Sequence, residues 1–171
     1  MLLSTIFRRR AHNRQHLFRS SIFGLEDSLV SSVGFLAGYA AIGSTSNAII
    51  KGGLILIMVE AFSMGVGTFL SENNSEEIMR KGKVSLIPAL QSSFVMFISY
   101  LIGGFFVLLP YLFFSPHLGG IISVLCSLFG LSGIGVITAY FAKTSYVIEL
   151  VKAILIGGLA TLIGVGVGLL V

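Results

Sequence analysis

Two acidic residues, Asp27 and Glu60, stand within long stretches that are otherwise apolar. An ionised carboxylate at bilayer depth costs at least about 2.5–3.5 kcal/mol on insertion scales, so such a residue usually faces a partner, a cavity or an ion path. Each acid begins a stripe of small or weakly polar residues at the spacing of one helix face. The two stripes are Asp27, Ser31, Gly34 and Gly38, and Glu60, Met64, Gly67 and Ser71, with Ser63 alongside.

Met64 shares the face of Glu60, one helical turn away. A methionine in an apolar helix is usually core filler, and close helix packing is the simpler interpretation of the glycines. Carboxylates together with a thioether, however, suit a borderline transition metal better than Mg²⁺ or Ca²⁺. The candidate metal ligands are therefore Asp27, Met64 and Glu60. The residues that would line an ion path are Ser31, Gly34, Ser63 and Gly67.

A second acidic group follows the Glu60 helix, in the segment 72–86. Two interpretations are open: a solvated helical extension held by ion pairs at i, i+4 spacing, or an entrance that collects cations from the cytosol. The candidate metal-entry residues are Glu72, Glu76 and Glu77. Glu149 and Lys152 stand at i, i+3, and this spacing predicts an ion pair at the membrane surface.

The composition excludes most other classes of protein. Apolar side chains make up 55% of the 171 residues, charged ones only 11%, and there are 21 glycines. These values do not fit a soluble globular enzyme, a disordered tail, a collagen or a nucleic-acid-binding domain. A single cysteine excludes a disulfide framework and a Cys-based zinc site. The sequence holds no phosphate-binding loop and no plausible Ser/His/Asp set, so we expect a secondary transporter and not an ATP-driven pump or an enzyme.

Stretches without charged residues predict an all-α, polytopic membrane protein with five transmembrane helices. A span needs about 20 apolar residues. Residues 84–142 contain no Lys, Arg, Asp or Glu, and as one straight helix they would measure about 88 Å, so they must fold back near Pro110 and Pro116. The predicted spans are 24–46, 49–71, 87–113, 118–142 and 147–171.

The distribution of Lys and Arg predicts the orientation. With a cytoplasmic N-terminus, ten of the 11 basic residues lie on the inner side and only Lys51 lies outside, which follows the positive-inside rule and places the C-terminus outside. Residues 1–23 then form a basic cytoplasmic or interfacial segment that could rest on anionic lipid or serve only as a retention cluster, and residues 24–171 form the transport domain.

Four stretches of the chain resemble motifs of the vacuolar iron transporter (VIT) family. They are GLEDSLVSSVGFLAG (24–38), AFSMGVGTFLSENNSEE (61–77), GGFFVLLPYLF (103–113) and LIGGLATLIG (155–164). The order matches the family over residues 23–171. The departures include Glu26 where the family has asparagine, Ser28 for glycine, Thr68 for glutamate and Val107 for proline. Well-known members insert a metal-collecting helical domain between helices 2 and 3, and this chain resembles the nodulin-like branch that lacks it.

The resemblance implies proton-coupled export of Fe²⁺, with Mn²⁺ as a second candidate ion, by a homodimer whose path runs near both copies of the first helix. It implies that Asp27 matches the family's metal-site aspartate and Met64 its S-M methionine, whereas Glu60 is an added acid. Lipid, protons and the transported ion are the expected partners, without nucleic acid and without a permanently bound cofactor. The expected location is the plasma membrane in a prokaryote and a vacuolar-type membrane in a eukaryote.

Two other functions stay open. A proton-coupled exporter of organic cations would use Glu60 as its central acid, although the chain has no tryptophan and an odd number of predicted helices. A non-transporting membrane scaffold would bind partners through its glycine faces, and its function would survive the loss of Asp27 and Glu60.

Overall fold

The structure, a computed structural model, describes the backbone of residues 2–82 and 84–170 and the side chains of residues 14–79, 81–82 and 84–170. Its elements are the helices α1 (Leu2–Ala41), α2 (Ser46–Arg80), α3 (Ile87–Leu108), α4 (Pro110–Phe113), α5 (Pro116–Ala142) and α6 (Tyr146–Leu170). The predicted all-α class is confirmed, since the described backbone contains no strand. Part of the basic N-terminal segment, with Arg8, Arg9 and Arg10, lies outside the residues whose side chains are described.

Local chemistry sets where the helices begin and end. Thr45 caps α2, because its Oγ1 accepts a hydrogen bond from the Ala48 amide at 3.3 Å. Lys81 and Lys143 end α2 and α5 in the left-handed region, with φ of 52° and 55°. Pro116 begins α5, where its fixed φ suits the first helical turn.

Several helix bounds differ from the predicted spans. α1 begins at Leu2 and runs unbroken through residue 24, and α2 continues past residue 71 to Arg80, which is the helical extension that the sequence left open. The predicted helix 87–113 is divided into α3 and the single turn α4 at Pro110, which has no amide proton to donate.

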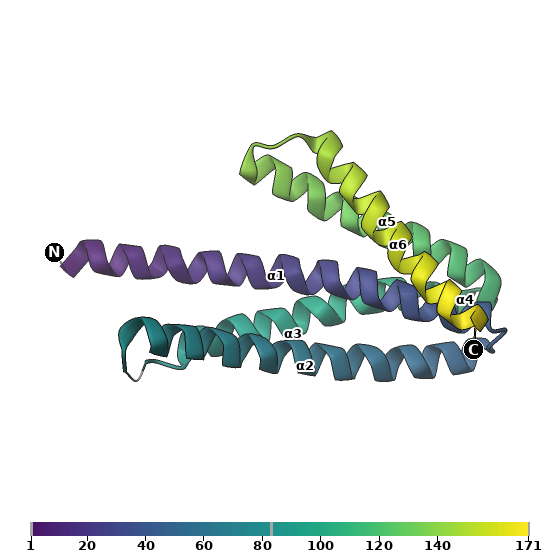
Figure 1. The fold of residues 1–171 in the computed structure, drawn as a ribbon, viewed down its shortest axis with the longest axis horizontal. Coiled ribbons are helices and arrows are strands. Elements are labelled where there is room, and N and C mark those ends of the chain that lie inside the picture. The colour runs from purple at the N-terminus through teal and green to yellow at the C-terminus, as the bar shows by residue number, and fades with distance from the viewer. Residues whose placement is uncertain (1, 83, 171) are drawn as a thin grey trace.

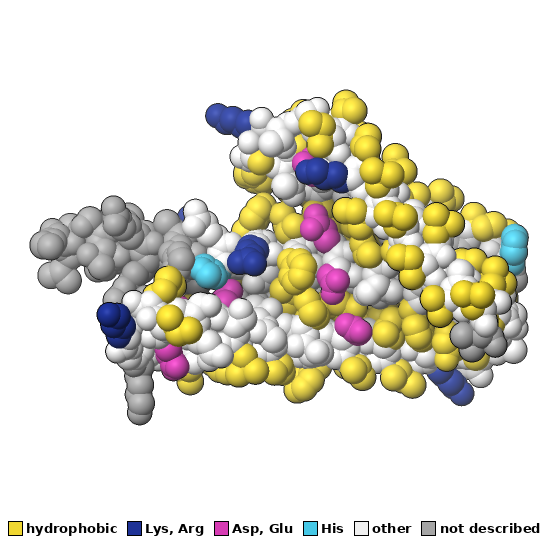
Figure 2. Space-filling view, viewed as in Figure 1, with side chains coloured by type: hydrophobic (Ala, Val, Ile, Leu, Met, Phe, Trp, Pro, Cys, Tyr) yellow, Lys and Arg dark blue, Asp and Glu magenta, His cyan; other side chains and the backbone are white. Residues whose placement is uncertain are grey.

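Among the described residues, four helices are long and apolar enough to cross a membrane: Ser46–Met79, Ile87–Phe113, Pro116–Ala142 and Tyr146–Leu170. α1 is not among them, because its apolar part also carries Glu26, Asp27 and several serines. Large hydrophobic side chains remain exposed along all four spans, and many of them are visible on the face shown in Figure 2. Such a surface would aggregate in water but is suited to lipid.

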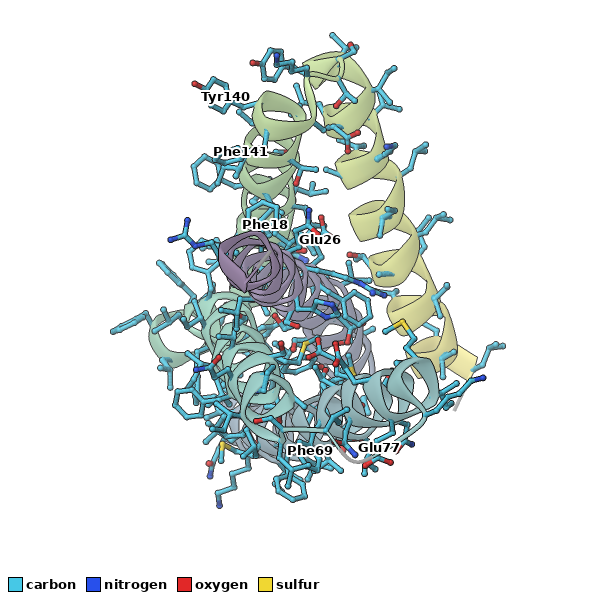
Figure 3. The ribbon with its side chains drawn as sticks, turned by 90° about the vertical axis from the view of Figure 1, so that its left-hand side faces the viewer. Phe18, Glu26, Phe69, Glu77, Tyr140 and Phe141 are labelled. Atoms are coloured by element: carbon cyan, nitrogen blue, oxygen red, sulfur yellow. The ribbon has the colours of Figure 1, made fainter. Side chains whose placement is uncertain are left out.

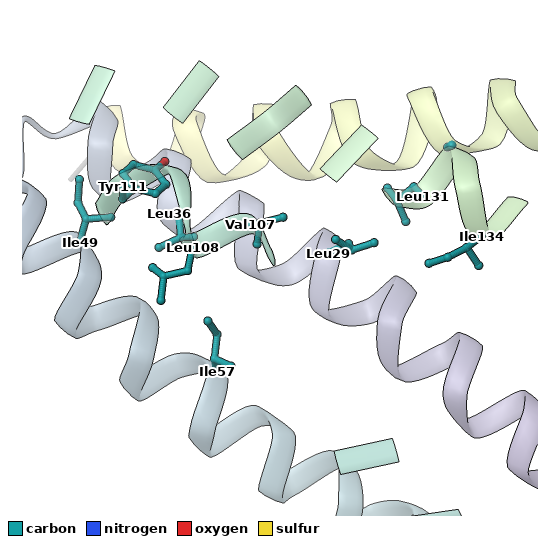
Figure 4. Packing of buried hydrophobic residues seen from close by; sticks show 10 residues of the cluster. Leu29, Leu36, Ile49, Ile57, Val107, Leu108, Tyr111, Leu131 and Ile134 are labelled. Atoms are coloured by element: carbon teal, nitrogen blue, oxygen red, sulfur yellow. The ribbon is translucent and has the colours of Figure 1, made fainter. Parts of the chain in front are cut away.

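α1 lies between two helix pairs, with α2 and α3 on one side and α5 and α6 on the other (Figure 1). The α5–α6 hairpin diverges from α1 towards the end where the N-terminus lies (Figure 1). Buried apolar side chains from both pairs meet on α1 (Figure 4). They are Leu29, Leu36, Ile49, Ile57, Val107, Leu108, Tyr111, Leu131, Ile134 and Ala153.

Glycines bring α1 and α6 into direct backbone contact. A Cβ built on Gly38 would lie 2.6 Å from the Gly164 carbonyl oxygen, and one on Gly168 would lie 2.6 Å from the Gly38 oxygen. Only residues without a side chain allow this approach. Gly164 and Gly168 form a GxxxG step on α6, and their contact with α1 fixes the level at which the two helices cross.

Candidate functional site

The two membrane carboxylates lie at the same level of the bundle. Asp27 precedes the end of α1 at Ala41 by 14 residues, and Glu60 follows the start of α2 at Ser46 by 14 residues. α1 and α2 are antiparallel neighbours with a short connection (Figure 1), so both acids stand about 21 Å from that turn at 1.5 Å per residue. Both side chains are half-buried, and their charges are close enough to interact.

A tyrosine from a third helix stands beside this acidic pair. Tyr100 of α3 is fully buried, and its hydroxyl is hydrogen-bonded to the Ser31 Oγ at 2.6 Å. The same hydroxyl interacts electrostatically with Asp27 and with Glu60. Tyr100 thus connects α3 to α1 at the level of the two acids. Sequence reasoning missed it, because one tyrosine in an apolar helix carries no distinguishing pattern.

Met64 lies in a separate cavity of about 400 Å³ between α1, α2 and α3. Ser63, Gly67 and Glu72 line it with Met64, as do Arg19 and a second methionine, Met96. Three of the predicted metal-ligand and path residues therefore share one cavity with one predicted entry residue. Met96 also escaped sequence reasoning, because its thioether is one of several in apolar helices.

Asp27 lines a different cavity, of about 410 Å³, between α1, α5 and α6. Ser31 and Gly34 line a third, apolar groove of about 540 Å³ along α1 and α6. The predicted path residues thus line two separate hollows. Ser63 and Gly67 line the cavity of Met64, whereas Ser31 and Gly34 line the groove beside α6, and the Ser31 Oγ is also hydrogen-bonded to Tyr100 of α3. Glu60 is among the lining residues of none of these three hollows.

The predicted entry residues occupy the last turns of α2. The Glu72 Oε1 lies 3.0 Å from the His16 Nδ1 of α1, and Glu77 accepts a hydrogen bond from the Asn73 side chain at 3.3 Å. Glu76 is half-buried, while Glu77 is exposed near the end of α2 (Figure 3). The His16–Glu72 contact was not predicted, because nothing in the sequence sets the register of α1 against α2.

The predicted ion pair between Glu149 and Lys152 is confirmed. The Lys152 Nζ donates to the Glu149 Oε1 at 2.8 Å, with the two side chains 57% and 16% exposed. Both residues line the cavity that contains Asp27. Within the part of the chain whose side chains are described, no three His, Cys, Asp or Glu residues are grouped closely enough to hold a metal ion.

The fold and these hollows define a class: a helical integral membrane protein with acidic and thioether side chains between its helices. The sequence profile of the VIT family matches residues 18–86 and 81–169. The chain belongs to the VIT family, a family of membrane transport proteins. The two matched segments meet at the connection between α2 and α3. Vacuolar iron transporter homolog 2 of Oryza sativa subsp. japonica is 28% identical over 167 residues, which cover 88% of each chain.

Proposed function

We propose that this protein exports divalent transition-metal cations, Fe²⁺ and also Mn²⁺, from the cytoplasm in exchange for protons. The observation that carries the proposal is the pair of half-buried carboxylates, Asp27 and Glu60, placed at one level between three helices. Two negative charges kept at this depth need a cation or protons to balance them. Membership in the VIT family and the name of the rice relative favour a metal ion.

In the proposed cycle, a cytosolic metal ion binds ionised Asp27 with help from Met64, Glu60 and the Ser31 hydroxyl. A rearrangement of the helices then exposes the site to the outer side. Protons from that side neutralise the carboxylates and release the metal, because a protonated acid is a poor ligand. The thioether of Met64 adds a preference for softer transition metals over Mg²⁺ and Ca²⁺.

We infer a topology of five spans, in which α1 crosses the membrane in addition to the four apolar helices and the N-terminus is cytoplasmic. The ten-to-one distribution of basic residues supports this orientation. α1 contacts all four of the other long helices, so its polar residues have protein neighbours instead of lipid. This placement explains how a helix that carries Glu26 and Asp27 can stand in a membrane.

We also infer that the working unit is a homodimer. Within one chain, Asp27 and Met64 lie in separate cavities and Glu60 lines neither of them, and no described group of three His, Cys, Asp or Glu residues is close enough to bind a metal. A second copy, apposed near α1, would supply further carboxylate ligands. The open apolar groove along α1 and α6 offers a lipid-facing surface for that contact.

The test is uptake into proteoliposomes that have an acidic lumen and a neutral exterior. Under this gradient we expect Fe²⁺ and Mn²⁺ to accumulate together with an outward flux of protons. Loss of uptake when the gradient is dissipated supports proton exchange. Absence of metal uptake, or inhibition of uptake by ethidium-type cations that are themselves transported, would favour the organic-cation exporter.

Replacing Met64 by leucine tests the thioether. Leucine keeps the volume and removes the sulfur, so Fe²⁺ uptake should fall about three- to tenfold, with a smaller fall for Mn²⁺, which prefers oxygen ligands. Met58→Leu is the matched control, because Met58 lies on the same helix at a 48% exposed, lipid-facing position. Equal rates for the two variants would remove Met64 from the ligand set.

Replacing Tyr100 by phenylalanine tests the hydroxyl beside the acids. The ring remains, but Ser31 loses its partner at 2.6 Å, and a buried polar group left without a partner costs about 1–3 kcal/mol. We expect initial uptake rates to fall about tenfold. Tyr111→Phe is the control: Tyr111 is equally buried but packs on Gly119 of α5. If both variants behave alike, the effect comes from packing and not from the hydroxyl.

A further inference from the structure

The cavity that contains Asp27 opens where the α5–α6 hairpin diverges from α1. Its polar lining consists of Glu26, Asp27, Glu149 and Lys152, and its volume is about 410 Å³. Glu26 lies on the face of α1 that is turned towards α5 and α6 (Figure 3). The rest of the lining is apolar or glycine. This cavity lies at the end of the hairpin where α6 begins, which the basic residues place on the cytosolic side.

The charges in this cavity do not balance. Three carboxylates face one ammonium group, and Glu26 interacts electrostatically with both Glu149 and Lys152. The Lys152 Nζ is held 2.8 Å from the Glu149 Oε1. The apolar walls limit screening by water, so the net negative charge attracts cations more strongly than it would on an open surface.

Of these four side chains, that of Lys152 can most easily move out of the cavity into water. Its side chain is 57% exposed, whereas that of Glu149 is 16% exposed. A lysine has a long flexible stem and can carry its ammonium group out into water. Glu149 and Glu26 have shorter side chains on α6 and α1, so their carboxylates would remain in the cavity and face the cation that replaces the Lys152 ammonium group.

We propose that this cavity is the cytosolic entrance to Asp27 and that Lys152 is a tethered cation which an entering metal ion must displace from Glu149. The inference rests on the proposed function and names its entry route. The predicted entrance at the end of α2 differs from it, because Glu72, Glu76 and Glu77 do not line the cavity that contains Asp27, and Glu72 is already in contact with His16.

This arrangement favours divalent over monovalent cations. A monovalent ion offers Glu149 no more than the attached ammonium group does, and it lacks the advantage of being tethered at high local concentration. A divalent ion gains twice the Coulomb attraction to the same carboxylates and can displace the lysine. Lys152 therefore lowers the apparent affinity for the metal and keeps Na⁺ and K⁺ out of the cavity.

The test measures KM and maximal rate of Mn²⁺ uptake by the full-length protein in the proteoliposome assay, with and without K⁺ outside. For Lys152→Met we expect KM to fall about two- to fivefold with the maximal rate retained. This is the size of effect expected when one partly exposed ion pair, that of Lys152 with Glu149, is lost. External K⁺ should inhibit this variant and not the parent. Glu149→Gln should act in the opposite direction and raise KM.

Lys143→Met is the matched control, because Lys143 ends α5 at the same end of the hairpin but does not line the cavity. It removes one positive charge from the same surface and should leave KM and K⁺ sensitivity unchanged. An unchanged KM in Lys152→Met, or an equal shift in both lysine variants, would overturn the inference. If Lys152→Met fails to fold, an unaltered KM in Glu149→Gln overturns it as well. A parent protein that transports no metal would instead refute the proposed function itself.

Discussion

Asp27→Asn is expected to lower metal uptake driven by an acidic lumen by about 100-fold or more, since even loss of a group that only supports a metal ligand costs 10–100-fold. Asparagine keeps the shape of the side chain and its capacity for hydrogen bonds, but it can neither carry a negative charge nor exchange a proton in this pH range. The substitution therefore removes the charge that attracts the metal and the group that would release it. Initial rates of ⁵⁴Mn uptake, normalised to reconstituted protein, measure the effect.

The controls for Asp27→Asn separate three interpretations. Glu77→Gln makes the same change of charge at an exposed position on α2 and should reduce uptake only slightly. Glu60→Gln tests the second acid: a total loss in this variant, with normal uptake in Asp27→Asn, would transfer the central role to Glu60 and favour the organic-cation exporter. If the parent transports neither metal ions nor organic cations, the non-transporting scaffold becomes the better interpretation.

The positions of the apolar helices follow directly from the sequence, but several of their ends do not. Charged residues end a membrane-spanning stretch, yet Arg, Lys and Glu are good helix formers. α1 therefore extends back to Leu2 through the basic segment, and α2 continues to Arg80 through its acidic one. The charged residues predict where the membrane-spanning part of a helix ends. The helix itself continues until a residue such as Lys81 adopts the left-handed conformation.

Part of the candidate site could be predicted because it depends on distance along one helix. The Glu149–Lys152 pair, three residues apart on α6, is of this kind. The remaining contacts depend on how helices are aligned and rotated against one another. Tyr100 meets Ser31 across 69 residues and His16 meets Glu72 across 56. No periodicity within a helix contains that information, so the division of the predicted path residues between two separate hollows emerges only from the fold.

Gly164→Ala is expected to give the largest loss of stability among single-methyl additions to α6. A Cβ on Gly164 would overlap the Gly34 carbonyl group of α1. Backbone atoms cannot rotate aside as a flexible side chain can, so the two helices must separate along their glycine contact. We expect a destabilisation of about 1–3 kcal/mol, as for other overpacked sites, measured as a lower midpoint of thermal unfolding in detergent.

Gly166→Ala is the control for this substitution, because nothing lies within 4 Å of a Cβ at Gly166. Alanine is a better helix former than glycine by about 1 kcal/mol, so this variant should be as stable as the parent or more stable. The same substitution of glycine by alanine, made two residues apart, is therefore expected to lower the stability at Gly164 and to keep or raise it at Gly166. Equal midpoints would mean that α1 and α6 do not cross at Gly34 and Gly164. The cavity that contains Asp27 lies between these same two helices, so that result would also remove the basis for an entrance beside Lys152.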